Sequence, residues 1–340
     1  MLQVRIHGPD DVRLDEVPEP KPGPRDALLR VASCGICGSD LGYARIGGVA
    51  GPTREPMPIG HELAGVVEAV GAEVRAFAPG DRVALNPSPP QGGPVIGNGA
   101  PEGGFAPLLL VRDVEGGGRK PRLHALPEGM SFETAALAEP LGVGMNAVDK
   151  LRVAPGEKAV VFGAGPVGLA AVASLRDQGV EDVVSVDLSA HRLGLARALG
   201  ARATLHAGEV DVWKGLREIH GEADFMGMPV AASDVYVEAS GASPLIQQVI
   251  GNARRGARLS VVALHRAPIE VSFLLVLMRE LQINGAMEYP EDFARSLGVL
   301  ARDDLGAMIT HRFPLERFAD ALEIARDPDV AGKVMIEIAP

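Results

Sequence analysis

Residues 159–168 decide the fold of this chain, and they read Ala159-Val160-Val161-Phe162-Gly163-Ala164-Gly165-Pro166-Val167-Gly168. The four apolar residues predict a buried strand, and the glycines that follow have the spacing G-x-G-x-x-G. The next run, Leu169 to Gln178, has the pattern of an amphipathic helix. Glycines at such a turn let a pyrophosphate approach the helix N-terminus closely. The stretch therefore predicts a dinucleotide-binding loop.

An acidic residue stands where such a loop requires one, because Asp187 lies 187 − 168 = 19 positions after the last glycine. A carboxylate there accepts hydrogen bonds from a ribose 2′-hydroxyl and repels a 2′-phosphate, so NAD is favoured over NADP. Arg192 can hold either the ribose hydroxyls or a phosphate. The alternative is a glycine-rich turn of another α/β fold, with Asp187 as a helix cap. The expected cofactor-binding residues are Gly163, Gly165, Pro166, Val167, Gly168, Asp187 and Arg192.

The pattern on either side of the loop divides the chain into a β-rich part and an alternating part. Before about residue 130, short runs are broken by Gly and Pro, which is typical of a compact β domain, with a long surface loop from Asn86 to Phe105. Ser131 is a candidate helix cap. Apolar runs then alternate with helices, and they include Asp182–Val186, Asp234–Glu238, Arg258–Ala263 and Glu280–Asn284. This alternation predicts a doubly wound parallel sheet of six strands.

The last residues return to mixed character and end in the strand-like run Gly332 to Ile338. We therefore expect a β-rich domain over 1–145 that resumes over 285–340, interrupted by a nucleotide-binding domain over 146–284.

Composition excludes several classes of protein. Hydrophobic residues make up 46% of the 340, with 23% charged, which fits a soluble globular chain. A net charge of −11 argues against nucleic acid as a partner. The N-terminus lacks the apolar core of a signal peptide, and no apolar run reaches membrane-spanning length, so a cytoplasmic location away from membranes is expected. Two cysteines exclude a disulfide-stapled scaffold and a four-cysteine zinc site.

Candidate metal ligands lie in the first part of the chain. Cys37 is in Cys34-Gly35-Ile36-Cys37-Gly38-Ser39-Asp40, and His61 and Glu62 follow it by 24 and 25 residues. A thiolate and an imidazole are both good zinc ligands. A redox Cys-x-x-Cys pair is the alternative, but such pairs begin a helix, and this region reads as β.

Five motifs in order resemble those of the zinc-dependent medium-chain alcohol dehydrogenases. They are Cys37-Gly38-Ser39-Asp40, Gly60-His61-Glu62, Gly80-Asp81-Arg82-Val83, Ala138-Glu139-Pro140-Leu141 and the loop Gly163 to Gly168. Glu139-Pro140-Leu141 stands where classical members have a cysteine ligand, so the sorbitol, butanediol and threonine dehydrogenase branch is the most similar. The tail, with Thr310 to Glu316 and Lys333 to Ile336, is also similar to sorbitol dehydrogenase.

The resemblance implies a discontinuous, β-rich GroES-like catalytic domain and a doubly wound Rossmann domain. It implies one catalytic zinc on Cys37 and His61, with Glu62 or Glu139 as third ligand. Asp40 would accept a hydrogen bond from His61 and orient its ring, and Ser39 would take the substrate proton, so Ser39, Cys37, His61 and Glu62 are the expected catalytic residues. The resemblance also implies a homodimer or homotetramer in which the strand Glu280–Asn284 pairs across subunits. It implies a small alcohol or ketone as the substrate.

Three departures from the family pattern narrow these expectations. The four cysteines that hold a structural zinc in many relatives are absent between Asn86 and Phe105, so one zinc per chain is expected. Gly42 stands where many relatives have a histidine that ends a proton relay, which leaves water or Tyr43 for that role. Sorbitol dehydrogenases bind polyol hydroxyls with an arginine shortly before a Tyr-Pro pair. The residues Asn284 to Glu288 before Tyr289-Pro290 include no arginine, so a more apolar secondary alcohol or a diol fits better.

Two other functions share parts of this pattern. A zinc-free medium-chain quinone or enoyl reductase has the same fold, but the joint presence of Cys37, His61 and Glu139 argues against it. A non-catalytic NAD-binding protein would be marked by loss of the ligands, which this chain keeps.

Overall fold

The computed structural model describes residues 1–89, 93–115 and 121–338. The chain divides into two compact units: unit 1 comprises Met1–Glu139 and Glu291–Pro340, and unit 2 comprises Pro140–Pro290. Unit 1 is therefore interrupted by unit 2 in the sequence. The division falls after residues 139 and 290, against the expected domain limits at 145 and 284, which stay predictions.

Unit 2 is built on a six-stranded sheet in which all neighbouring strands run parallel, in the order β11-β10-β9-β14-β15-β16. Its strands are β9 (Lys158–Phe162), β10 (Asp182–Asp187), β11 (Ala203–His206), β14 (Val235–Glu238), β15 (Arg258–Val261) and β16 (Gln282–Gly285). Its helices are α3 (Ala138–Asp149), which begins in unit 1, α4 (Pro166–Asp177), α5 (Ala190–Ala198), α6 (Val212–His220), α7 (Ser243–Asn252) and α8 (Phe273–Met278). The strand order reverses between β9 and β14, which confirms the doubly wound sheet.

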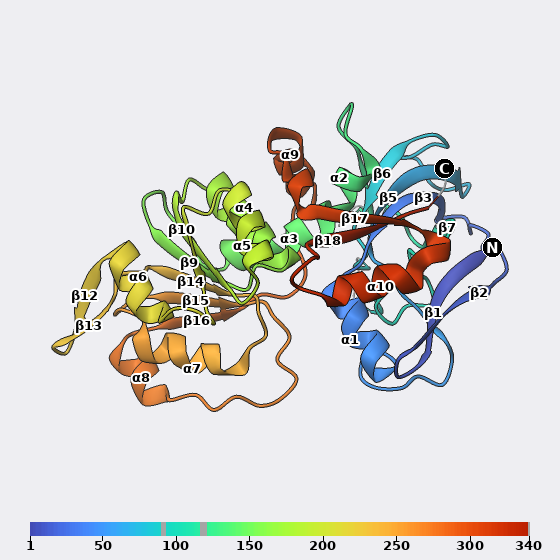
Figure 1. Ribbon diagram of the computed structural model, residues 1–340. Coiled ribbons are helices and arrows are strands. Elements are labelled where there is room, and N and C mark those ends of the chain that lie inside the picture. The colour runs from blue at the N-terminus through green and yellow to red at the C-terminus, as the bar shows by residue number, and fades with distance from the viewer. Residues whose placement is uncertain (90–92, 116–120, 339–340) are drawn as a thin grey trace. The chain divides into compact units, whose positions relative to one another are not determined.

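The helices cover both faces of this sheet, with α4 and α5 on one face and α6 and α7 on the other (Figure 1). The second face holds an apolar cluster in which Leu216 of α6 and Val249 of α7 lie with Phe162 and Tyr236 of the strands. The sequence predicted apolar strands that alternate with helices along the chain, and such strands are buried on both faces of a parallel sheet.

Two elements of unit 2 have no counterpart among the expected strands. The edge strand β11 has no buried residue, and its sequence has no continuous apolar run that would have predicted a strand. The hairpin β12 (Glu222–Phe225) and β13 (Met228–Ala231) turns at Met226 and Gly227, both with positive φ. Elements that bury little apolar surface leave a weak sequence signal.

Unit 1 is built on a mixed sheet with the strand order β17-β18-β3-β5-β6-β8, to which β7 adds by pairing with β3. These strands are β3 (Ala27–Gly35), β5 (Glu62–Val70), β6 (Arg82–Leu85), β7 (Leu108–Val111), β8 (Leu123–Ala125), β17 (Ile309–Pro314) and β18 (Lys333–Glu337). A smaller sheet has β2 (Asp11–Glu16), β1 (Leu2–Gly8) and β4 (Met57–Pro58). The helices are α1 (Gly38–Ile46), α2 (Phe132–Ala136), α9 (Ala294–Arg302) and α10 (Phe318–Arg326), with 3-10 turns η2 (Leu305–Met308) and η3 (Leu315–Arg317).

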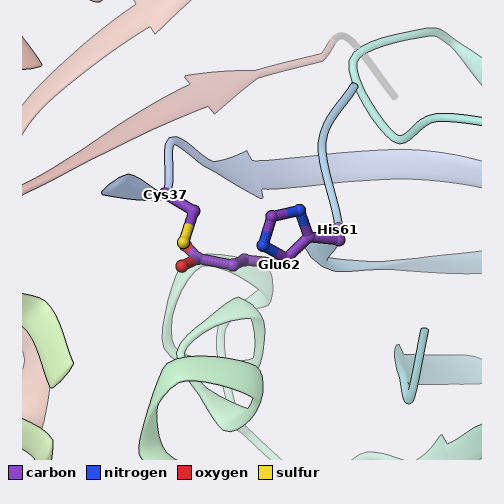
Figure 2. A group of neighbouring side chains, drawn as sticks. All are labelled: Cys37, His61 and Glu62. Carbon is purple, nitrogen blue, oxygen red and sulfur yellow. The ribbon is translucent and has the colours of Figure 1, made fainter. Parts of the chain in front are cut away.

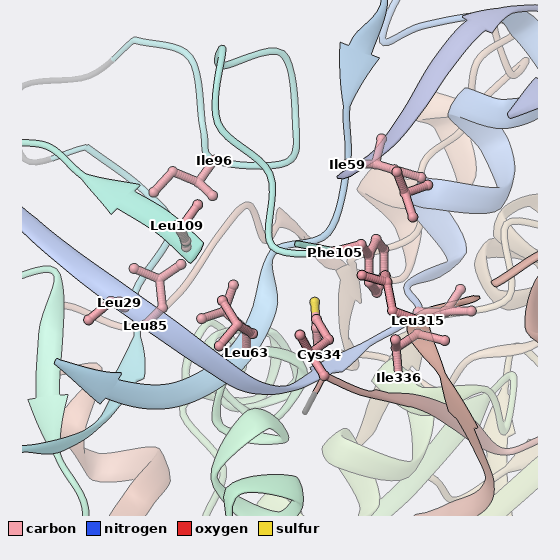
Figure 3. Packing of buried hydrophobic residues seen from close by; sticks show 14 of the residues in the cluster. Leu29, Cys34, Ile59, Leu63, Leu85, Ile96, Phe105, Leu109, Leu315 and Ile336 are labelled. Atoms are coloured by element: carbon pink, nitrogen blue, oxygen red, sulfur yellow. The ribbon is translucent and has the colours of Figure 1, made fainter. Parts of the chain in front are cut away.

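The strand β18, near the end of the chain, pairs with β3 from its beginning, in the register Ile336 opposite Cys34. The core of unit 1 joins these strands, and Cys34 lies in it among Leu63, Phe105 and Leu315 (Figure 3). Return of the chain to this sheet is what brings a residue near position 333 next to residues near position 62.

The expected surface loop from Asn86 to Phe105 is irregular but only partly on the surface; residues 90–92 lie outside the described residues. Ile96 and Phe105 are buried in the core of unit 1. The expectation of a surface loop is therefore wrong for these two side chains. A segment without regular secondary structure can still place single apolar side chains in the core. Ser131, as expected, caps α2 by accepting a hydrogen bond from the Thr134 N–H at 3.1 Å.

Candidate functional site

Cys37 lies between a strand and a helix. β3 ends at Gly35, and Cys37 is the N-terminal cap of α1, with its own N–H donating to Asp40 Oδ2 at 2.9 Å. A helix N-terminus favours the thiolate form of a cysteine. The sequence-based reading of this region as β is therefore wrong, because α1 contains two glycines and a weak apolar pattern and is set by this capping contact. Both cysteines are free thiols.

His61 and Glu62 enter the site from a tight turn before β5. Gly60 adopts φ +95, and a Cβ at this position would lie 2.7 Å from the ring of Phe105. Only glycine accepts both the positive φ and the close approach of Phe105, so Gly60 fixes the position of the backbone from which the His61 side chain extends. His61 is 5% exposed and Glu62 is 1% exposed. The turn thus places both side chains in the interior of unit 1.

The side chains of Cys37, His61 and Glu62 converge on one place. One ligand atom of each, a sulfur, a nitrogen and an oxygen, lie within 4.8 Å of one another. Figure 2 shows the Cys37 sulfur and the Glu62 carboxylate pointing toward each other, with the His61 ring beside them. Glu62 Oε1 is buried and has no hydrogen-bond partner among the described residues. A buried, unpartnered oxygen beside a thiol and an imidazole matches the donor chemistry of zinc.

Ser39 and Asp40 flank the imidazole of His61. Ser39 Oγ lies 3.4 Å from His61 Nε2, and Asp40 Oδ1 lies 3.7 Å from His61 Nδ1. The second distance is too long for a hydrogen bond, and in the described structure both of these atoms are buried without a partner. Asp40 thus stands on the side of the ring where an orienting carboxylate is needed. It does not hydrogen-bond the ring here.

Lys333 is a site residue that the sequence did not single out for chemistry. It is fully buried, and its Nζ donates to Glu62 Oε2 at 2.5 Å and to the Ile36 carbonyl at 3.0 Å. The only available signal was a lysine at the start of the apolar run Val334 to Ile336. A lysine is almost never fully buried unless it is paired.

Burial and nearby charges shift the titration of these groups. Burial raises the pKa of Cys37, and Glu62 adds to this, while His61 opposes it. Burial alone lowers the pKa of His61, but Asp40 and Cys37 outweigh it and hold that pKa well above its ordinary value. Burial likewise lowers the pKa of Lys333, and Glu62 and Cys37 more than compensate. The raised pKa values of His61 and Lys333 favour their positive forms, which balance the buried carboxylates, and the raised pKa of Cys37 favours a neutral thiol.

Glu139, Cys34 and Tyr43 surround the convergent group without joining it. Glu139 is buried in the first turn of α3 and acts on His61 and Lys333 through its charge, but it is outside the three-atom group found among the described residues. Burial raises the pKa of Cys34 well above its ordinary value, so its thiol stays protonated. The Tyr43 hydroxyl donates to Asn98 Oδ1 at 2.7 Å, next to Gly42.

The phosphate loop in unit 2 has the predicted strand–turn–helix form. β9 ends at Phe162, Gly165 caps α4, and Pro166 is the first helical residue. A Cβ on Gly168 would lie 1.8 Å from the Gly163 carbonyl oxygen, so no other residue fits there. Gly165, Pro166 and Val167 are half-buried, which leaves one side of the turn open. The loop thus has the close backbone packing that phosphate binding requires.

Asp187 stands at the end of β10 beside this loop. Its carboxylate accepts hydrogen bonds from the Ala164 N–H at 2.6 Å and from the Ser189 N–H at 2.8 Å. Arg192 lies in the first turn of α5, and its Nη1 is 3.8 Å from the position that a Cβ on Gly165 would take. The carboxylate is therefore held in a fixed place at the loop, with one cation close by.

The segment before Tyr289-Pro290 has no arginine, and its backbone is fixed within unit 2. Asn146 donates to the Met287 carbonyl at 2.8 Å and to the Glu288 carbonyl at 3.3 Å. Glu288 adopts φ +62. The exposed side chains at this point are Met287, at 71%, and Glu288.

Comparisons with known proteins agree with this architecture. Residues 23–115 match the alcohol dehydrogenase GroES-like domain, and residues 166–302 match the zinc-binding dehydrogenase family. Sorbitol dehydrogenase from Homo sapiens is 33% identical over 350 residues, covering 100% of this chain and 96% of its own. The Rattus norvegicus enzyme is also 33% identical, over 358 residues and with the same coverage. The match therefore extends over both units.

Solved structures show the same fold. 2R,3R-butanediol dehydrogenase from Bacillus subtilis superposes with a TM-score of 0.87 at 26% identity, covering 99% of each chain. Galactitol-1-phosphate dehydrogenase from Escherichia coli has a TM-score of 0.85 at 25% identity, covering 99% of this chain and 100% of its own.

The chain belongs to the zinc-dependent medium-chain alcohol dehydrogenases. It is an oxidoreductase with a GroES-like part and a Rossmann-type part, as the motif order indicated. The family binds zinc and a nicotinamide dinucleotide, and its substrates are small alcohols. In the described part of the chain, no helix is both long enough and apolar enough to cross a membrane.

Proposed function

We propose that this enzyme moves a hydride between a secondary alcohol or a diol, or the matching ketone, and NAD, with a single zinc ion at Cys37, His61 and Glu62. The observation that carries the proposal is the buried meeting of a thiol, an imidazole and an unpartnered carboxylate oxygen within 4.8 Å. Three protein ligands that leave a fourth position open are typical of catalytic zinc. Two free cysteines, one of them a ligand, fit a reducing compartment, so we place the enzyme in the cytoplasm.

Glu62 completes the ligand set in this proposal, and Glu139 stays near it as a charge. Glu62 supports this assignment because one of its oxygens is held by Lys333 while the other is free to bind. Asp40, on the far side of the ring, is the acceptor for His61 Nδ1 once the imidazole is a ligand, which leaves Nε2 for the metal. The donor set of sulfur, nitrogen and oxygen is compatible with zinc.

Bound zinc supplies a Lewis acid, which favours loss of the hydroxyl proton of an alcohol. Ser39 Oγ receives that proton, since its hydroxyl lies on the Nε2 side of His61. The Tyr43 hydroxyl donates a hydrogen bond to Asn98 Oδ1, so we assign onward transfer of the proton to water. The nicotinamide ring supplies the hydride acceptor.

NAD is favoured over NADP because Asp187 places a negative charge where a 2′-phosphate would lie. Backbone N–H groups from both sides hold this carboxylate, which fixes it toward the ribose position. Arg192, whose Nη1 lies close to Gly165, holds the ribose hydroxyls or a phosphate in this proposal. The phosphate loop residues Gly163, Gly165, Pro166, Val167 and Gly168 supply the remaining contacts.

The substrate class rests on similarity and on one missing side chain. Relatives named for sorbitol and for 2R,3R-butanediol point to neighbouring hydroxyl groups. The absence of an arginine before Tyr289, and the exposed apolar Met287, favour a substrate with fewer hydroxyls than a sugar alcohol. We therefore expect a secondary alcohol or a vicinal diol to be oxidised faster than sorbitol.

Metal analysis and a substrate panel test this function. Protein purified without chelator is expected to contain close to one zinc per chain, and less than about half an equivalent would overturn the zinc mechanism. A zinc-free reductase or a non-catalytic NAD-binding protein would give that low value. NAD reduction is then measured with secondary alcohols, diols, polyols, hydroxyacyl thioesters and threonine. Faster turnover of sorbitol than of every simple alcohol or diol would refute the substrate assignment.

A second copy of the chain is the partner we propose for the edge of the sheet in unit 2. β16 is the last strand of that sheet, and Ile283 on it is 40% exposed. α8 exposes three apolar side chains, Phe273 at 76%, Leu274 at 67% and Leu277 at 72%. An open strand edge beside exposed apolar residues favours pairing between subunits. Light scattering is expected to give a dimer or tetramer that Leu277→Lys weakens, and a monomeric wild-type protein would contradict this.

A further inference from the structure

A second pair of buried polar residues lies in unit 2, whereas the proposed zinc ligands belong to unit 1. Glu238 is the last residue of β14 and is fully buried. His265 follows the end of β15 by four residues, and its side chain is 9% exposed. His265 Nε2 and Glu238 Oε2 are 2.7 Å apart. Because β14 and β15 are neighbouring parallel strands, the end of β14 and the segment after β15 lie at the same carboxyl edge of the sheet.

The hydrogen bonds of this pair leave one atom unexplained. Glu238 Oε1 accepts hydrogen bonds from Ser240 N and Gly241 N, each at 2.9 Å, and from Ser240 Oγ at 2.6 Å. A carboxylate only accepts, so Nε2 of His265 is the protonated nitrogen of the pair. In the tautomer that carries its proton on Nε2, Nδ1 is the accepting nitrogen, and it is buried with no hydrogen-bond partner among the described residues. An imidazole held so firmly on one side and unsatisfied on the other needs a further partner.

The turn after Glu238 packs on the phosphate loop on one side and on the segment before His265 on the other. A Cβ on Gly163 would lie 2.8 Å from Ser240 N, so the turn that Glu238 organises packs directly on the loop. A Cβ on Gly241 would lie 3.8 Å from the Leu264 carbonyl oxygen, next to His265. In doubly wound sheets a dinucleotide spans the point where the strand order reverses, with one nucleoside on each half. Asp187 marks the first half, and the Glu238–His265 pair lies on the second.

We propose that His265 Nδ1 accepts a hydrogen bond from the nicotinamide nucleoside of the cofactor, and that Glu238 fixes the ring and its tautomer for this contact. The proposal rests on the proposed use of NAD. The donor on the cofactor is a ribose hydroxyl or the carboxamide N–H. Leu264, adjacent to His265, is 59% exposed, so the loop that carries His265 lies at the surface of unit 2.

Two substitutions separate the two nitrogens of the ring. His265→Gln keeps a polar group at the position of Nε2, within reach of Glu238, but removes Nδ1. His265→Asn keeps a polar group near the position of Nδ1 and loses the contact with Glu238. Unchanged thermal unfolding and unchanged Trp213 fluorescence, which reports on unit 2, show that each variant is folded.

Titration calorimetry with AMP, ADP-ribose, NAD and 3-acetylpyridine adenine dinucleotide, which has no amide N–H, tests the proposal. His265→Gln is expected to bind NAD about tenfold more weakly, the equivalent of one net hydrogen bond at about 1.4 kcal/mol, with AMP binding unchanged. His265→Asn should recover part of this loss. Weaker binding of ADP-ribose as well identifies a ribose hydroxyl as the donor. A loss confined to NAD, and absent with the acetylpyridine analogue, identifies the carboxamide.

Three results would overturn the proposal. If His265→Gln bound both NAD and ADP-ribose with wild-type affinity, the proposed contact would be refuted, and NAD would remain the proposed cofactor. An equal loss of AMP binding would show that His265 only supports the fold of unit 2. Failure of the wild-type protein to bind NAD would refute the proposed cofactor itself, and the contact with it.

Discussion

The buried pair Glu62–Lys333 makes a quantitative prediction about the proposed zinc site. Both side chains are at most 1% exposed, and Lys333 Nζ lies 2.5 Å from Glu62 Oε2. Lys333→Met fills a similar volume but leaves the Glu62 carboxylate buried without its cation. Breaking a buried pair from one side costs about 3–5 kcal/mol. In metal-free protein we expect a loss of this size in the free energy of unfolding of unit 1.

Zinc changes the expected size of this loss. A carboxylate that binds a divalent cation through Oε1 is no longer an uncompensated charge, so Lys333→Met should cost much less in the zinc-loaded protein. The double variant with Glu62→Gln removes both charges and should recover much of the stability in the metal-free state, because paired removal leaves no buried ion. Glu62→Gln alone is the matched control, since it strands Lys333.

Calorimetry and far-UV circular dichroism measure the effect. A loss of about 3–5 kcal/mol in a unit of this size lowers Tm by about 6–20 °C. Trp213 lies in unit 2, so its fluorescence follows the unit that the substitution leaves untouched. An equal drop in Tm with and without zinc would refute the assignment of Glu62 as a ligand. A drop below about 1 kcal/mol in metal-free protein would show that the pair is not buried in solution.

Three further outcomes are expected. Asp187→Ser should weaken NAD and relax discrimination against NADP in steady-state kinetics, and unchanged NAD kinetics would mean that Asp187 does not contact the ribose. Gly168→Ala should abolish dinucleotide binding by calorimetry, since its Cβ would lie 1.8 Å from the Gly163 carbonyl oxygen, whereas Gly194→Ala, with open space around its Cβ, should bind normally. Burial lowers the pKa of His220, so its contribution to stability is present above the unfolded pKa of about 6.5 and is lost as the pH falls from there through the lower pKa of the folded state. Tm should therefore fall from pH 7 to pH 5 more steeply in the wild type than in His220→Gln, and equal slopes would contradict a lowered pKa of His220 in the folded protein.

Local sequence predicted the phosphate loop because its constraints are local. The positions of Gly163 and Gly168 are fixed by one turn and by the helix that follows it, so spacing alone carries the information. The six-stranded sheet was predictable for the same reason, as most of its strands are apolar on both faces. The edge strand β11 and the hairpin β12–β13 bury little and gave no comparable signal.

The proposed choice of Glu62 over Glu139 as the third zinc ligand was not predictable from spacing. It depends on where β18 joins the sheet of unit 1, which brings Lys333 to Glu62 across 271 residues. The helix α1 was hidden for a related reason, since the Cys37–Asp40 cap rather than apolar periodicity marks its start. Motif order could assign the residues to one site. Only their packing shows which oxygen is left free.

The charges of the candidate site indicate what binding of the proposed zinc would do to its protons. Without a metal, the Glu62 carboxylate is matched by Lys333, and the pKa values of Cys37 and His61 are raised, so both carry protons in the buried site. Those two protons occupy the atoms that a divalent cation would need. Zinc would displace them, because its ligands are a thiolate and a neutral imidazole, and binding therefore releases protons. Lys333 keeps its place in both states, since it holds the other oxygen of Glu62. The buried charges are thus arranged so that a dication can replace protons without breaking the ion pair beside it.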